Sequence, residues 1–98
     1  MFVSINNGLK LTIPLSAKEI PKCLNEAIEE MGLNNTNTRL YTNAYFTLLN
    51  KNDENYNKQK EIYEFYIAYC DKFINERKRG SVMDARFHKK RLTDSISY

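Results

Sequence analysis

Three residues near the C-terminal end have the types and spacing that could support catalysis. Ser81, Asp84 and His88 are three and four positions apart, so a helix over residues 81–88 would place them on one face. A hydrolase built on these types uses the Ser hydroxyl as nucleophile, the His imidazole as base and the Asp carboxylate to orient the imidazole. Three such side chains on one short helix rarely reach that geometry, and the sequence suggests no oxyanion hole. We therefore predict a capping role for Ser81 and Asp84, a solvent-exposed His88 and no catalytic residue.

Metal, cofactor and acid–base sites also lack support in the sequence. The single histidine and the two distant cysteines, Cys23 and Cys70, form no ligand-spaced cluster, and three scattered glycines form no phosphate-binding loop. Glutamates gather on two predicted helices opposite the apolar positions, which is typical of a solvated helix face rather than of paired catalytic carboxylates. We predict that the protein is not an enzyme and holds no metal or cofactor. The glutamates in question are Glu26, Glu29, Glu30, Glu61 and Glu64.

The composition is that of one globular domain. Of the 98 residues, 42% are hydrophobic and 28% are charged, which is ordinary for a folded protein. No apolar run approaches the ~20 residues of a membrane span. Residues 1–15 lack the basic and apolar regions of a signal peptide. We therefore expect a cytoplasmic protein without membrane contact, whose two thiols are reduced and lie in or near the core.

A long helix over residues 53–79 is the element around which the rest of the chain is predicted to pack. Its apolar residues recur at gaps of three and four, which defines one broad buried face. Acidic residues at its start and basic residues at its end suit the helix dipole, and Gly80 provides a stop. The core is predicted to include Ile62, Tyr66, Phe73 and Ile74.

Two short β-like runs precede this helix. Residues 2–5 and 9–13 alternate apolar and polar side chains. The Asn-Gly pair between them, at positions 7 and 8, favours a type I′ turn. The pattern therefore predicts an N-terminal β-hairpin.

The first helix is predicted to begin at a capping box. Ser16 and Glu19 have the spacing at which each side chain accepts a backbone N–H of the first turn, and Leu15 and Ile20 suit the accompanying hydrophobic staple. Pro21 leaves two alternatives open, namely a distorted first turn or a regular helix that starts at the proline.

The predicted fold class is mainly α (α+β), with an N-terminal β-hairpin followed by a three-helix bundle with one long C-terminal helix and a basic tail. Residues 39–49 fit a helix face and also a strand face, and we prefer a helix because the neighbouring elements are helical. Residues 1–79 are predicted to form the compact domain, and residues 80–98 a basic C-terminal extension. Residues 92–98 are expected to fray.

Basic charge is concentrated towards the C-terminus. Residues 76–91 hold seven Lys or Arg and two acidic residues, a local charge of +5 in a chain whose net charge is +3. A segment of this kind suits nucleic-acid phosphates or an acidic protein partner. The predicted contact residues in it are Arg77, Lys78, Arg79, Arg86, Phe87, Lys89, Lys90 and Arg91.

Phe65 is the remaining predicted contact residue. It lies about 100° from Tyr66 around the long helix, outside the main apolar face. The hairpin, a second subunit or a partner protein must therefore cover it. We predict a homo-oligomer, most simply a dimer through Phe65 or through the hairpin edge.

These features predict a small non-enzymatic regulatory or adaptor protein that binds another macromolecule, with a protein as the leading partner. The short chain and its Asn- and Lys-rich composition favour a phage or mobile-element gene whose product inhibits a host protein. The alternative is a nucleic-acid-binding protein that uses the basic residues 77–91.

Overall fold

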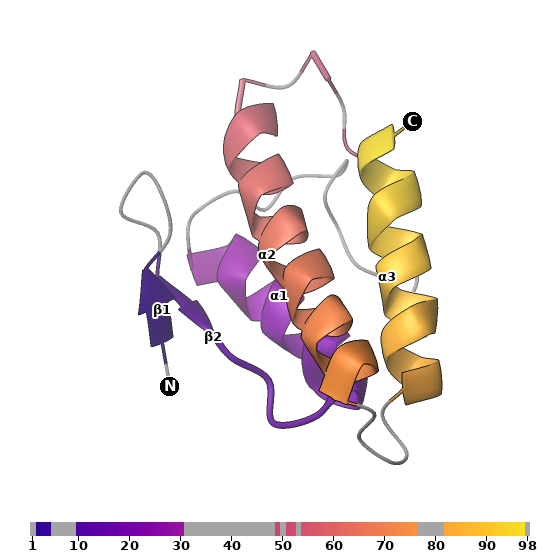
Figure 1. The fold of residues 1–98 in the computed structure, drawn as a ribbon. Coiled ribbons are helices and arrows are strands. Elements are labelled where there is room, and N and C mark those ends of the chain that lie inside the picture. The colour runs from indigo at the N-terminus through magenta and orange to yellow at the C-terminus, as the bar shows by residue number, and fades with distance from the viewer. Residues whose placement is uncertain are drawn as a thin grey trace.

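The computed structural model describes residues 2–4, 10–30, 49, 51–52, 54–76 and 82–97. Figure 1 shows helices α2 and α3 side by side, with α1 behind them and the two strands on the side of α2 away from α3. The predicted mainly helical class is confirmed for this part of the chain. Its elements in order are β1 (Phe2–Ser4), β2 (Lys10–Thr12), the 3₁₀ turn η2 (Ala17–Glu19), α1 (Ile20–Glu30), α2 (Tyr56–Glu76) and α3 (Val82–Ser97).

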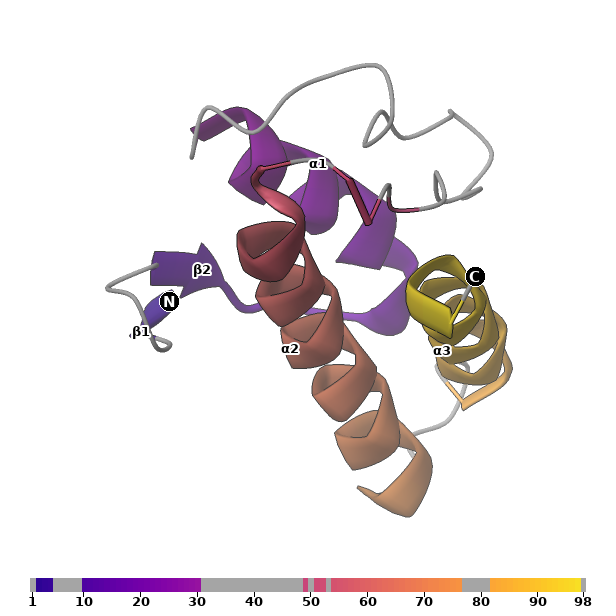
Figure 2. The ribbon, with the colours of Figure 1, turned by 90° about the horizontal axis from the view of Figure 1, so that it is seen from above.

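Helix α2 is the centre of the fold. In the view from above, it lies between the strands on one side and α3 on the other, with α1 packed across it (Figure 2). Ile62, Tyr66 and Phe73 are buried, as predicted. Ile74 is only half-buried, because it faces a surface hollow between α2 and α3. The other buried residues of α2 are Gln59, Tyr63 and Cys70.

Two tyrosine hydroxyls connect α2 to the strand region. The Tyr66 hydroxyl donates to the carbonyl oxygen of Thr12 at 3.2 Å, and the Tyr69 hydroxyl donates to that of Pro14. Burial of a phenol is favourable when its hydroxyl keeps a hydrogen-bond partner. Burial also raises the pKa of Tyr66, so this hydroxyl stays a donor at any physiological pH.

The two strands pair antiparallel, with Phe2 opposite Thr12 and Ser4 opposite Lys10. Leu11, which lies between Lys10 and Thr12 and opposite Val3, is buried in the core. The Asn-Gly turn predicted to join the strands lies outside the described residues, so this turn stays a prediction.

The start of the first helix differs from its prediction. Ser16 makes no side-chain cap, and the Glu19 carboxylate accepts the N–H of Leu15 at 2.8 Å instead of that of Ser16. The predicted staple is wrong, because Leu15 is 90% exposed while Ile20 is buried. Pro21 explains the change: it has no N–H to donate, and the chain forms the 3₁₀ turn η2 before the regular helix begins at Ile20.

The predicted fraying of the C-terminal residues is wrong as far as Ser97, because α3 continues to that residue. This helix packs along α2 and against η2. Ala85 and Leu92 are completely buried in the same core cluster as the α2 side chains. The residues predicted to form a basic extension therefore supply, within the described part of the chain, a helix of the core.

Residue 49 marks a further contact of α3. Leu49 is buried, and its N–H donates to the carbonyl oxygen of Ser95 at 3.2 Å. The rest of residues 39–49 lies outside the described residues, so the preference for a helix there stays a prediction. Among the helices that are described, none combines the length and apolar character needed to cross a membrane.

Candidate functional site

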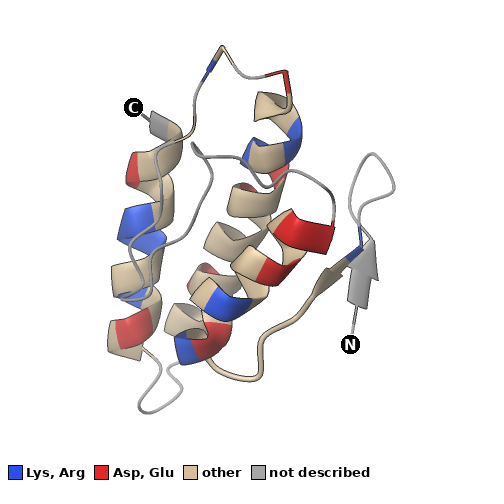
Figure 3. Ribbon diagram, turned by 180° about the vertical axis from the view of Figure 1, so that it is seen from behind, with Lys and Arg blue, Asp and Glu red and all other residues tan. Residues whose placement is uncertain are grey.

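Charged residues are unevenly distributed over the helices. Seen from behind (Figure 3), acidic positions gather towards the C-terminal end of α1, and basic positions recur along α3. On α1 the exposed acidic residues are Glu26, Glu29 and Glu30. The basic residues of α3 lie instead beside the surface that α2 and α3 form together, which we call the α2–α3 face.

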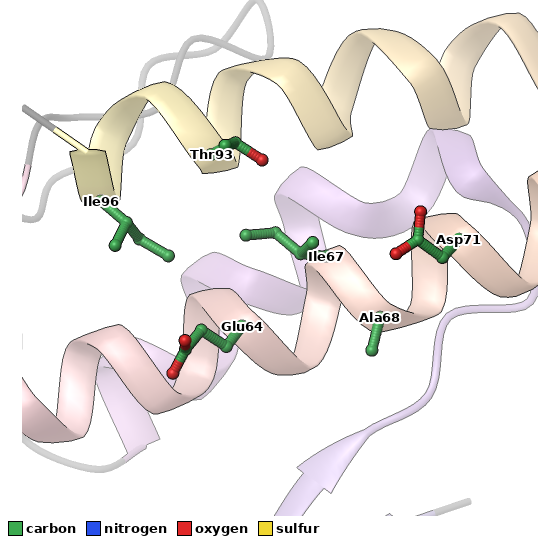
Figure 4. A pocket seen from close by; sticks show the side chains of 6 residues that line it. All are labelled: Glu64, Ile67, Ala68, Asp71, Thr93 and Ile96. Carbon is green, nitrogen blue, oxygen red and sulfur yellow. The ribbon is translucent and has the colours of Figure 1, made fainter.

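The first hollow of the α2–α3 face has an apolar floor and acidic groups. It has a volume of about 370 Å³ and lies between the two helices (Figure 4). Ile67 points from α2 towards α3, and Ile96 points from α3 towards α2 at the end of the hollow where Glu64 lies. The two carboxylates of this hollow both come from α2. The lining residues are Glu64, Ile67, Ala68, Asp71, Thr93 and Ile96.

The second hollow continues from the first at Thr93 and is mainly basic. It has a volume of about 430 Å³, and Ile74 is its apolar element. Arg86, Lys89 and Lys90 supply three cationic groups, and Asp94 one carboxylate. The α2–α3 face is therefore acidic towards one end and basic towards the other.

An ion pair crosses between the two hollows. The ammonium group of Lys89 lies 2.6 Å from a carboxylate oxygen of Asp71, and both side chains are nearly half exposed. An exposed pair of this kind contributes only about 0.2–1 kcal/mol to stability. Its main structural value is that it fixes Lys89 of α3 at the level of Asp71 on α2.

Two large apolar side chains of α3 are exposed to solvent beside these basic residues. Met83 is 83% exposed and Phe87 is 42% exposed. The guanidinium group of Arg91 lies 5.3 Å from the centre of the Phe87 ring, within range of a cation–π contact. We call Met83, Arg86, Phe87, Lys90 and Arg91 the α3 contact surface.

His88 lies on the opposite side of α3, and the prediction of a solvent-exposed histidine is wrong. Its side chain is 5% exposed and meets the edge of the Phe87 ring. Burial lowers the pKa of His88, although the nearby Asp84 carboxylate acts in the opposite direction. Ser81 lies outside the described residues, so the structure does not test the full set of three residues considered for hydrolysis.

The buried imidazole leads to a pH-dependent stability. Because the pKa of His88 is lower in the folded state than in the unfolded chain, the unfolded chain binds more protons as the pH falls below about 6.5. The free energy of unfolding should then fall with decreasing pH, by at most about 1.4 kcal/mol per pH unit from this residue. Urea unfolding of the parent and of His88→Gln between pH 7.5 and 5.5 would measure this, since both limits are about one unit from the ordinary pKa. If the free energy of unfolding fell equally with decreasing pH in both proteins, the expected linkage would be contradicted.

The cysteines are buried thiols with little nucleophilic character. Both are free and lie in the core. Burial, reinforced by Asp71, raises the pKa of Cys70 to about 12, and burial also raises the pKa of Cys23. Because the thiolate is the reactive form, neither position suits covalent catalysis at neutral pH.

The structure brings together only part of the predicted contact residues. Arg86, Lys89 and Lys90 line one hollow, and Phe87 with Arg91 lies beside it. Phe65 is separate: it is half-buried, and its ring meets the edge of the Tyr66 ring at 5.0 Å. Residues 77–79 lie outside the described residues, so the contacts predicted for Arg77, Lys78 and Arg79 stay untested.

The sequence did not reveal the acidic hollow. Its residues are shared between two helices, and Ile96 belongs to the segment that was predicted to fray. The available signal was the spacing of Glu64, Ala68 and Asp71, which places a small residue between two carboxylates on one side of α2.

The comparisons with known proteins give no match. No protein-family model matches the chain, and no curated protein or solved structure is significantly similar to it. Within the described residues there is also no group of three or more His, Cys, Asp or Glu side chains that could hold a metal ion.

Proposed function

We propose that this chain is a small non-enzymatic protein that binds another protein through the α3 contact surface. The observation that carries this proposal is the exposure of Met83 and Phe87 within a set of cationic side chains. The buried face of α3 already serves the core through residues such as Ala85 and Leu92. The exposed face is therefore available for a partner.

The mixture of apolar and cationic groups favours a protein over a phosphate backbone. Aromatic residues, Met and Arg are enriched in the buried centres of protein interfaces, whereas contacts to phosphate need only cations and hydrogen-bond donors. The partner suited to this surface carries carboxylates around an apolar depression that accepts Phe87. The cation–π contact of Arg91 holds the aromatic ring beside a positive charge and so prepares both features for the same partner.

The biological role that we propose is regulatory or adaptor binding, with inhibition of a host protein by a phage or mobile-element product as its most specific form. The surface that supports this role is the exposed α3 contact surface, while His88 and both cysteines are buried.

Affinity capture with matched variants would test the proposal. Tagged parent protein, Phe87→Ser and Leu15→Ser would be incubated with nuclease-treated extract of the source cell, and the bound proteins quantified. Leu15 is the matched control, because it is an exposed apolar residue that precedes η2 and is not part of α3. Loss of a central aromatic anchor should reduce the specific partner at least about tenfold, while Leu15→Ser should retain it. Equal capture by parent and Phe87→Ser would contradict the proposal.

Nucleic-acid binding is the second candidate, because Arg91 lies over the Phe87 ring and the same helix carries the exposed cations Arg86 and Lys90. In a mobility-shift assay, binding of this kind should weaken steeply with added salt, since each neutralised phosphate releases counterions. It should also weaken when Arg86 and Lys90 are both replaced by alanine. A parent protein that shifts neither DNA nor RNA at low salt would remove this candidate.

A further inference from the structure

The α2–α3 face carries opposite charges at its two ends. The acidic hollow contains Glu64 and Asp71, and the basic hollow contains Arg86, Lys89 and Lys90. Glu64 and Arg86, the outermost charges of the two groups, are both exposed. A ligand with one sign of charge would be attracted to one end of this face and repelled at the other.

The separation of the two ends follows from the geometry of the helices. Helices α2 and α3 run in opposite directions (Figure 1), and the ion pair sets Lys89 level with Asp71. At 1.5 Å per residue, Glu64 lies about 10 Å from this level in one direction, and Arg86 lies about 5 Å from it in the other. The acidic and basic ends are therefore separated along the groove by about 15 Å.

We propose that the α2–α3 face binds a second copy of the chain in a two-fold symmetric dimer. A two-fold axis that lies along the interface, perpendicular to the line from Glu64 to Arg86 and level with its midpoint, reverses the direction of the face. It places Glu64 of each copy opposite Arg86 of the second copy, so both ends meet an opposite charge. This is the self-complementarity that a symmetric dimer requires, since the same contact occurs twice.

Apolar groups between the charged ends add to this complementarity. The floor of the acidic hollow includes Ile67, Ala68 and Ile96, and the basic hollow adds Ile74. Ile67 and Ala68 lie between the levels of Glu64 and Arg86, so their exposed apolar area is removed from water between the charged contacts, which is the usual anatomy of a protein interface.

The proposed dimer interface is a second binding surface, in addition to the surface proposed for the protein partner. The two surfaces overlap. Arg86 belongs both to the α2–α3 face and to the α3 contact surface, so the dimer covers part of the surface proposed for the partner. The two states should therefore exclude each other. The interface also differs from the ones expected from the sequence, which involved Phe65 or the hairpin edge.

A charge-swap experiment on purified protein tests this inference without any partner. Sedimentation equilibrium would be run on the parent, on Glu64→Lys and on Arg86→Glu, from low to high micromolar concentration at low salt. The parent should approach twice the monomer mass, and each variant should remain at the monomer mass because like charges then face each other in both contacts. An equimolar mixture of the two variants should recover the double mass, since each contact of the mixed dimer again joins opposite charges.

Glu29→Lys on α1 is the matched control, because it makes the same charge change at an exposed site on a helix outside the α2–α3 face. It should leave the dimer intact, and circular dichroism should show all variants folded. A parent that keeps the monomer mass at every concentration would overturn the inference. Single variants that remain dimeric, or a mixture that remains monomeric, would overturn it as well. The capture experiment with Phe87→Ser changes neither Glu64 nor Arg86, so a failed dimer and a failed partner surface can be told apart.

Discussion

Replacing Tyr66 with alanine should lower the free energy of unfolding by about 3–5 kcal/mol, the range for truncating an aromatic side chain in a packed core. The side chain is completely buried in the cluster that joins α1, α2 and α3. Its ring also forms a T-shaped contact with that of Phe65, and its hydroxyl donates to the carbonyl oxygen of Thr12. The substitution therefore leaves a cavity and removes the connection from α2 to β2 together.

A second variant separates the cavity from the hydrogen bond. Tyr66→Phe keeps the ring and removes only the hydroxyl, so it should cost about 0.5–1.5 kcal/mol, the usual net value of one hydrogen bond. Urea unfolding followed by circular dichroism would give both values. If the free energy of unfolding depends on urea concentration with the same slope in all the proteins, the two-state comparison is valid. Two variants with the same small loss would show that the ring is not packed as described, and would contradict the central position of α2.

Large apolar residues made α2 predictable. Its buried face includes Ile62, Tyr66, Cys70 and Phe73, whose gaps of four, four and three identify the face directly. The 3₁₀ start of the first helix was less accessible. The spacing of Ser16 and Glu19 is the same in a regular capping box and in the observed η2 turn, and only the proline at position 21 distinguishes the two.

Helix α3 shows why the rest was missed. Its buried positions include Ala85, His88, Leu92 and Ser95, of which only one is a large apolar residue. A count of hydrophobic spacing gives little weight to a buried alanine or serine, while the density of Lys and Arg suggests a solvated tail. Small side chains are suitable there because the helix lies against both α2 and η2, and this packing is a tertiary property that local spacing does not contain.

The same reasoning applies to the candidate site. The basic residues Arg86, Lys89 and Lys90 were predicted as contacts from charge density alone, and the structure places them around one hollow. Their acidic counterpart across the groove depends on which residues of α2 stand level with them. That register is set by the packing of the two helices and by the pair of Lys89 with Asp71, so it could not be obtained from either helix separately.

Replacing Leu92 with alanine should lower the free energy of unfolding by about 2–5 kcal/mol. Leu92 is completely buried, and it is the large apolar side chain by which α3 enters the core. If residues 80–98 were instead a solvated extension, the same substitution would change stability by less than about 0.5 kcal/mol, as exposed substitutions usually do. Thr93→Ala is the control, because it alters the next residue of the same helix at an exposed position. Urea unfolding in which Leu92→Ala and Thr93→Ala both match the parent would show that α3 is not docked in solution. The α2–α3 face would then lose one of its two sides, and both the hollows and the proposed dimer interface would have to be abandoned.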